Sequence, residues 1–194
     1  MKVLIERAES EITVKKSRFI AIAIKADSLE KVKEIVKEVR DEHPKANHVV
    51  HAAVIGKNGT LYSSSDDKEP KNTAGRPALE VLKGSGITNI VVCVIRYFGG
   101  TLLGTGGLVK AYGDAVKSVL ETVKTEEMKE RESLALNFSY EYYTLLKRLF
   151  EKFNVSIETE DFSTDIKIHL IIDKERKEDF EKEARDIDPY ISIN

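Results

Sequence analysis

The stretch "RYFGGTLLGTGGLVKAY", residues 96–112, contains five glycines in seventeen residues. An apolar strand pattern ends at Phe98, and a helical pattern begins near 105–108, so a glycine loop (residues 99–107) joins a strand to a helix. The unpaired N–H groups and positive dipole end of such a helix can hold an anion. Glycines also allow the positive φ of a tight turn. Because a turn needs fewer than five, we favour a role in binding a ligand or partner.

The glycine loop lacks the residues of the common phosphate-binding motifs. A P-loop continues with Lys and Ser or Thr, whereas Leu108 and Val109 follow Gly107 here. A dinucleotide fingerprint needs glycine at position 109. Flanking side chains can still supply charge and stacking planes, with core packing as the alternative for the aromatic ones: Arg96, Tyr97, Phe98, Lys110 and Tyr112.

A second candidate is the polar segment "SSSDDKEPKNTAGRP", of which residues 63–76 are called the acidic loop here. Asp66, Asp67 and Glu69 could gather magnesium or act as acid and base. However, their order lacks the alternation and terminal Glu of a calcium loop, and no second acidic cluster completes a site. We therefore favour a loop whose Asp side chains cap turns and the following helix, and we expect no metal.

Other reactive side chains give weaker signals. His48 and His51 lie three apart in a predicted strand, so they face opposite sides and cannot chelate one ion together. Either could have a binding role near the glycine loop. Cys93 is the single cysteine, which excludes an intrachain disulfide, and its apolar neighbours predict a buried thiol. The serines at 63–65 have no visible base.

The apolar periodicity predicts two domains that meet near residue 130. A charged connector at 121–132 without an apolar face separates them. A capping box of Asp27 and Glu30 is expected to begin the first helix. The second domain reads as β-α-β-β-α-β, the ferredoxin-like order. The expected strands are 2–7, 11–24, 47–56, 60–63, 88–98, 133–140, 155–162, 165–173 and 190–193, and the expected helices are 26–44, 76–86, 105–120, 141–153 and 174–186.

The composition predicts a water-soluble protein. The 194 residues carry a net charge of −2, with no signal peptide pattern and no apolar run of membrane-spanning length, so we expect a cytoplasmic protein without membrane contact. Residues 133–194 have a net charge of −5 and residues 1–132 have a net charge of +3, which limits any nucleic-acid contact to a local patch on the first domain. The absence of Gln and Trp, with many Lys and Glu, fits a thermophilic source.

Three motifs together carry a family resemblance. "SRFIA" (17–21), "SDDKEPKNTAGRPALEVL" (65–82) and "VIRYFGGTLLGTGGLVKAY" (94–112) resemble the YigZ/IMPACT family, which includes bacterial YigZ-like proteins and the domain found in eukaryotic IMPACT. The similarity spans roughly residues 1–125, and the following segment is similar to the small C-terminal domain of the bacterial members. Lys68 and Asn72 stand where the family usually has glycine, and Lys110 where it commonly has Arg.

The resemblance implies an α+β protein of two domains. Residues 1–130 would form a ribosomal-protein-S5-domain-2-like α/β domain of the IMPACT type, and residues 131–194 a ferredoxin-like domain. It also implies a link to translation, since eukaryotic relatives regulate a kinase that senses amino-acid starvation by competing for its ribosome-associated activator. The family implies no cofactor, and its members are not established enzymes.

We therefore expect a binding protein of the translation apparatus, in which both loops form one surface for RNA, the ribosome or a ribosome-associated protein. The alternatives are an enzyme that holds a nucleotide phosphate at 99–107, with magnesium on Asp66, Asp67 and Glu69, and an adaptor that binds only protein. On the first view, Arg96→Ala weakens binding and leaves the fold intact. The expected binding residues are Arg18, Asp66, Asp67, Glu69, Lys71, Thr73, Arg76, Arg96, Tyr97, Phe98, Gly99, Gly100, Gly104, Gly106, Gly107, Lys110 and Tyr112.

Overall fold

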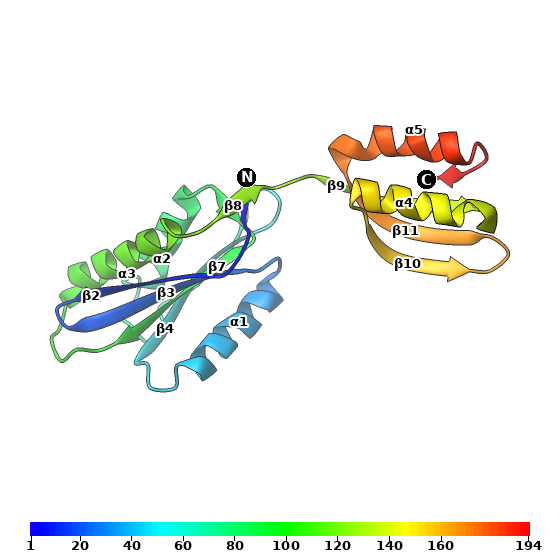
Figure 1. The fold of residues 1–194 in the computed structure, drawn as a ribbon. Coiled ribbons are helices and arrows are strands. Elements are labelled where there is room, and N and C mark those ends of the chain that lie inside the picture. The colour runs from blue at the N-terminus through cyan, green and yellow to red at the C-terminus, as the bar shows by residue number, and fades with distance from the viewer. The chain divides into compact units, whose positions relative to one another are not determined.

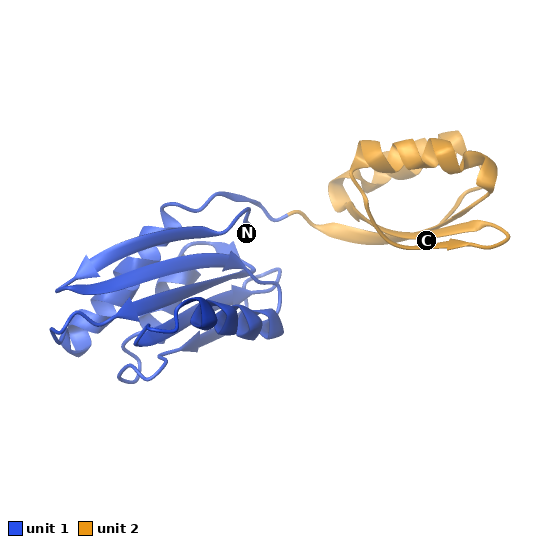
Figure 2. Cartoon of the chain, turned by 60° about the horizontal axis from the view of Figure 1, so that its bottom comes forward, with its two compact units in different colours: residues 1–128 blue, residues 129–194 orange.

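The computed structural model describes residues 1–194 and contains two compact units, Met1–Met128 and Lys129–Asn194 (Figures 1 and 2). The expected division after residue 130 differs from this one by two residues. Each unit combines helices with an antiparallel sheet, so the predicted α+β class is confirmed. Separate clusters of buried apolar side chains lie in the two units. No helix is long and apolar enough to cross a membrane.

Unit 1 is built on a five-stranded antiparallel sheet in the order β2-β3-β7-β4-β5. Helices α2 and α3 cover one face of this sheet and α1 covers the other, because alternate strand residues join the apolar clusters of the two faces (Figure 1). The bounds are β2 Ala8–Val14, β3 Ser17–Lys25, α1 Leu29–Glu42, β4 His48–Ile55, β5 Leu61–Ser65, α2 Gly75–Gly84, β7 Ile90–Tyr97 and α3 Gly104–Leu120.

The central strand β7 is buried on both faces, as its continuous apolar sequence predicts. Cys93 lies in the middle of this strand with no exposed surface. Burial raises the pKa of its thiol to about 12, so the thiolate is scarce at neutral pH. The predicted structural role of this cysteine therefore agrees with its position.

A second, small sheet has the order β6-β1-β8. Strand β1 (Lys2–Leu4) pairs in parallel with β6 (Ile87–Thr88) and antiparallel with β8 (Thr125–Glu127). Strand β8 lies in the segment that the sequence predicts to be a charged connector between the domains, and the strand itself was not predicted. Ladder hydrogen bonds join backbone groups, so a charged segment can form an edge strand without an apolar face.

The predicted strand over 11–24 is in fact a hairpin. Strands β2 and β3 are joined at Lys15 and Lys16, whose φ values are 45° and 69°. Positive φ at both central residues is the requirement of a type I′ turn, which Asn-Gly usually meets. The lysine pair therefore carries no turn signal in the sequence.

The start of α1 also differs from the prediction. Ser28 is the N-cap, and its side chain accepts a hydrogen bond from the N–H of Lys31 at 3.2 Å. Asp27, which the sequence predicts to be the capping residue, lies one position earlier. Both residue types are good caps, so the one-residue error follows from adjacent Asp and Ser.

Unit 2 is an antiparallel sheet in the order β10-β11-β9-β12, with α4 and α5 on one face (Figure 2). Buried residues of β11 alternate with more exposed ones, and the buried set packs against both helices. The β-α-β-β-α-β order confirms the predicted ferredoxin-like domain. The bounds are β9 Arg131–Phe138, α4 Tyr143–Phe153, β10 Ser156–Phe162, β11 Ile166–Asp173, α5 Lys177–Ile187 and β12 Ser192–Ile193, with 3₁₀ turns at Tyr140–Tyr142 and Lys174–Arg176.

Candidate functional site

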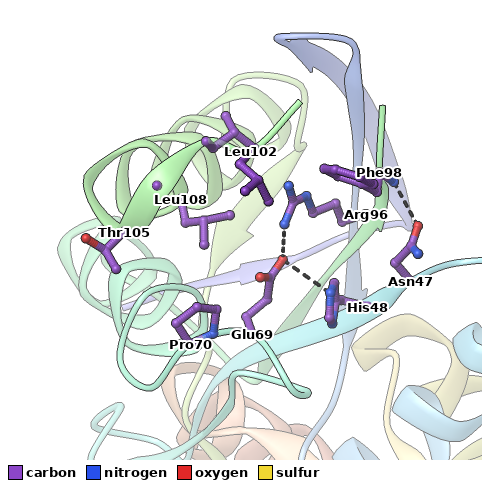
Figure 3. A pocket seen from close by; sticks show the side chains of 11 residues that line it. Asn47, His48, Glu69, Pro70, Arg96, Phe98, Leu102, Thr105 and Leu108 are labelled. Carbon is purple, nitrogen blue, oxygen red and sulfur yellow. Dashed lines mark hydrogen bonds and ion pairs between the residues drawn. The ribbon is translucent and has the colours of Figure 1, made fainter. Parts of the chain in front are cut away.

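The acidic loop and the glycine loop meet at one pocket in unit 1 (Figure 3). Its volume is about 450 Å³, and its surface is mostly apolar. Glu69 and Pro70 come from the acidic loop, and Arg96 comes from the end of β7. Asn47 and His48 come from the start of β4. The remaining wall is formed by the glycine loop, its flanks and the first turns of α3, through Phe98, Leu102, Leu103, Gly104, Thr105 and Leu108.

A buried ion pair forms the polar part of the pocket. Arg96 Nη1 donates to Glu69 Oε1 at 2.6 Å, and the two side chains are only 6% and 4% exposed. The guanidinium carbon lies 5.5 Å from the ring centres of both Phe19 and Phe98. The strand register explains this arrangement, since Phe19 and His48 are the direct neighbours of Arg96 on β3 and β4.

Tyr112 completes the environment of the Glu69 carboxylate. Its hydroxyl donates to Glu69 Oε1 at 2.8 Å, and its ring meets Phe19 edge to face at 5.2 Å. Burial, and then the charge of Glu69, raise the pKa of this phenol far above its usual range. The hydroxyl is therefore a permanent donor. Tyr112 has no exposed surface, so it packs in the core and does not present its ring to a ligand.

The burial of Arg96 contradicts one expectation. Arg96→Ala cannot be expected to leave the fold intact, because it would leave the Glu69 carboxylate buried without its counter-ion. Arg96 is also incompletely paired, since its Nε is buried and has no hydrogen-bond partner. This side chain is thus part of the framework of the pocket, and only 6% of its surface is exposed.

Asp66 holds the acidic loop in shape. Its Oδ1 accepts hydrogen bonds from the N–H groups of Ala74 at 3.1 Å and Gly75 at 2.8 Å, and its Oδ2 accepts one from Asn72 at 2.8 Å. The residue thereby caps the start of α2, which is the structural role that the sequence favours.

Asp67 ties the same loop to β4 and α1. Its Oδ2 accepts a hydrogen bond from the N–H of Val49 at 2.6 Å and forms an ion pair with Arg40. Its carbonyl oxygen lies 2.7 Å from His48 Nδ1, so that nitrogen carries the proton. The molecule contains no group of three His, Cys, Asp or Glu side chains that could hold a metal ion.

The stability of the acidic loop should depend on pH through Asp66. Burial alone would raise the pKa of this carboxyl, but three N–H donors together hold the pKa below its ordinary value. A lowered pKa stabilises the fold fully above about pH 4, and this contribution is lost progressively as the pH falls from there through the lower pKa of the folded state. In urea unfolding, Asp66→Asn should therefore destabilise unit 1 at pH 7 and less at pH 3. The exposed Asp161→Asn in unit 2 is the control and should have little effect at either pH, whereas an equal loss at both pH values for Asp66→Asn would contradict the account.

Three residues in the acidic loop adopt a conformation that favours glycine. Asp67, Lys68 and Asn72 have φ values of 43°, 69° and 63°, and the family resemblance places glycine at the last two of these positions. Lys68→Gly should raise the free energy of unfolding by about 0.5–1 kcal/mol, because the left-handed strain removed exceeds the entropy that glycine adds to the unfolded chain. Urea unfolding measures this change. Lys71→Gly is the control in the same loop, has no positive φ to relieve, and should be destabilising.

The glycine loop uses its glycines in different ways. A Cβ on Gly99 would lie 2.0 Å from the carbonyl oxygen of Lys16, so the loop passes against the β2–β3 turn only because this residue has no side chain. Gly100 and Gly104 have φ values of 83° and 71°, which L side chains rarely adopt. Gly106 lies in the first turn of α3, where added atoms would meet open space. The structure therefore contains both turn glycines and an unobstructed helix start.

Two expected binding residues lie on the other face of the sheet. Tyr97 follows Arg96 in β7 and points to the opposite side, where its hydroxyl lies 2.8 Å from His43 Nδ1. Arg18 pairs with Glu11 at 2.8 Å and lies over the Tyr97 ring. The structure does not bring Arg18 and Tyr97 to the pocket, because neighbouring residues of a strand face opposite ways.

The remaining expected residues are not among those that line the pocket. Thr73 is buried, and its hydroxyl donates to the carbonyl of Pro70 at 2.6 Å. Lys71 and Arg76 are exposed, and the exposed Lys110 pairs with Asp114 at 3.0 Å on α3. Gly107 lies in the first turn of α3, close to Leu103.

Sequence reasoning missed six residues that line the pocket, which are Asn47, Pro70, Leu102, Leu103, Thr105 and Leu108. Asn47 accepts a hydrogen bond from the N–H of Phe98 at 2.8 Å and so fixes the start of the glycine loop. Leu102 is 83% exposed, and Leu103 lies beside it. A pair of leucines inside a glycine-rich loop is the signal that could have found them, since a loop that only turns has no need of large apolar side chains.

Comparison with known proteins defines the family. Residues 15–120 match the model of the Impact N-terminal domain, and residues 136–187 match a domain of unknown function, DUF1949. An IMPACT family member of Haemophilus influenzae is 39% identical over 175 residues, which cover 89% of this chain and 85% of the relative. The IMPACT family member YigZ of Escherichia coli is 36% identical over 175 residues, with 89% and 86% covered. The chain therefore belongs to the YigZ/IMPACT family.

One solved structure supports the same assignment. The crystal structure of a hypothetical protein has a TM-score of 0.81 and 32% identity, and the match covers 99% of this chain and 95% of that one. The predicted family and fold are both confirmed. The two family models also fall within units 1 and 2 respectively.

Proposed function

We propose that this protein is a binding protein linked to translation regulation, and that it contacts a ribosome-associated protein through the pocket of unit 1. The observation that carries the proposal is the convergence of the acidic and glycine loops on that pocket. The Arg96–Glu69 pair forms the buried polar part of the pocket, whereas Phe98 and Leu102 at its rim are exposed and apolar. Family membership supplies the link to translation.

The occupied carboxylates favour binding over nucleotide chemistry. Asp66 and Asp67 already accept backbone hydrogen bonds, and Glu69 accepts from Arg96 and Tyr112. A magnesium ion would have to compete with these donors for the carboxylate oxygens, and the three side chains do not gather into a group that could hold a metal ion. The glycine loop also lacks the lysine and hydroxyl that hold phosphate and metal in P-loop enzymes.

The exposed side chains favour a protein partner over RNA. Phe98 is 44% exposed and Leu102 is 83% exposed, and exposed apolar groups beside a pocket are typical of protein contacts. Arg96 is neutralised by Glu69, and Lys110 by Asp114. Lys71 and Arg76 remain as the cations that an RNA contact would use.

The test is cosedimentation of the purified chain with ribosomal subunits, before and after a high-salt wash that removes associated proteins. We expect binding to unwashed subunits, loss of binding after the wash, and weak binding to labelled single- and double-stranded RNA. Leu102→Ala should weaken the binding, whereas Leu61→Ala, an equally apolar exposed change on β5, should not. RNA binding that falls steeply with salt would support RNA as the partner and contradict the proposal. Heat from ATP with Mg²⁺ in calorimetry would instead favour the nucleotide-binding alternative.

A further inference from the structure

The pocket contains a buried cation whose hydrogen bonds are incomplete. Arg96 is 5% exposed, and its Nη1 donates to Glu69 while its Nε has no partner. Buried donors without a partner are rare in folded proteins because they lose their hydrogen bonds to water. Figure 3 shows this guanidinium directed toward Glu69 in the space beside the glycine loop. The Nε atom itself is out of reach, but Arg96 lines the pocket with the 6% of its side chain that stays exposed, so an acceptor in the pocket can approach this cation.

The start of α3 supplies further donors in the same pocket. Its N-cap is Leu103, which makes no capping hydrogen bond through its side chain, and no acidic residue lies in the first turn. The first N–H groups of a helix have no partner within the helix. Gly104 and Thr105 line the pocket, and the Cβ positions of Gly104 and Gly106 meet open space. A ligand can therefore approach this backbone closely.

The charges around the pocket favour a carboxylate over a phosphate. Glu69 neutralises Arg96, so the buried pair adds almost no net positive charge. The partial positive charge of a helix start suits a single negative charge. A carboxylate also approaches Glu69, but it brings one negative charge where a phosphate dianion brings two, and no unpaired lysine or arginine lines the pocket to offset the second charge.

The rest of the lining surface is apolar. Phe98, Leu102 and Leu108 form walls around the polar groups, and Pro70 lies on the acidic-loop side. Apolar walls with a few converging donors bind a molecule that has an apolar body and a single anionic end. The C-terminal residue of a polypeptide has this form when its side chain is apolar, and backbone N–H groups are known to capture such carboxylates.

We propose that the pocket binds the C-terminal end of a partner polypeptide whose last side chain is apolar. The terminal carboxylate accepts hydrogen bonds from the Arg96 guanidinium and from N–H groups at the start of α3. The last side chain packs against Leu102 and Leu108. This inference rests on the proposed function and specifies which segment of the protein partner is recognised.

The first test compares two probes with the full chain by NMR titration. They are the acetylated tripeptide Ala-Ala-Leu with a free carboxylate and the same peptide with a C-terminal amide. We expect the free acid to shift the amide signals of Thr105 and Gly106 and to bind roughly tenfold more tightly, the value of one charge-assisted hydrogen bond. Equal binding of the two peptides, or no binding of either, would overturn the inference. Tighter binding of phenyl phosphate than of the free acid would also overturn it.

Two variants test the two halves of the contact. Thr105→Pro removes one N–H in the first turn of α3, where proline is tolerated. It should weaken the binding of the free-acid peptide but not the binding of the amide peptide. Leu102→Ala should weaken the binding of both peptides, and Leu61→Ala should change the binding of neither. Circular dichroism checks that each variant is folded. If the chain binds unwashed ribosomal subunits but neither peptide, the inference fails while the proposed function stands. If the chain binds the free-acid peptide but not the subunits, only the proposed function fails.

Discussion

Glu69→Ala is expected to lower the free energy of unfolding of unit 1 by about 3–5 kcal/mol, because it leaves Arg96 as an uncompensated buried charge. The hydroxyl of Tyr112 loses its acceptor in the same change. Urea unfolding followed by circular dichroism measures the effect. The variant can be studied at low temperature if it is only partly folded at 25 °C.

Two further variants test whether the loss of stability comes from leaving a buried charge unpaired. Glu80→Ala removes an exposed glutamate that pairs with Lys83 on α2, and it should change the free energy of unfolding by less than about 1 kcal/mol. Replacing both buried partners, as Glu69→Leu with Arg96→Met, should restore much of the stability, since no buried charge then remains unpaired. If the double variant is as unstable as Glu69→Ala, the unpaired charge is not the cause.

Gly99→Ala is expected to lower the free energy of unfolding of unit 1 by about 3 kcal/mol, because the added Cβ would lie 2.0 Å from the carbonyl oxygen of Lys16. Backbone atoms cannot move aside as a flexible side chain can, so the glycine loop or the β2–β3 turn must shift. The measurement is again urea unfolding. Peptide binding at the pocket should weaken as well, since the loop that begins here forms one wall.

Gly106→Ala is the matched control, because its Cβ meets open space in the first turn of α3. Alanine has the higher helix propensity, so this variant should be more stable than the wild type by about 0.5–1 kcal/mol. Opposite signs for the two alanine variants would show that close approach, and not glycine content, matters at residue 99. A loss of stability in both would contradict this.

Much of the fold could be predicted because its signals are local. The apolar stripe of α1, the continuous apolar run of β7 and the order of elements in unit 2 each lie within a short window of sequence. The errors also have local causes. Lys15 and Lys16 form a hairpin turn without the usual turn residues, and the pairing of β8 with β1 joins segments more than a hundred residues apart.

The candidate site could be predicted only to a limited extent. The sequence singled out Glu69 and Arg96 separately, but no local pattern shows that residues 27 positions apart form a buried pair. It also placed Tyr97 beside Arg96, although strand alternation sends the two side chains to opposite faces. Which residues share a pocket depends on the register of β3, β7 and β4, and that register is set by long-range pairing.

The single cysteine gives this protein a built-in reporter. Cys93 lies in the buried central strand of unit 1, and unit 2 contains no thiol. A maleimide or disulfide reagent can therefore react only when unit 1 opens, so the labelling rate measures that opening without an introduced probe. Events confined to unit 2 leave the signal unchanged, which allows the dynamics of each half to be assigned within the intact chain.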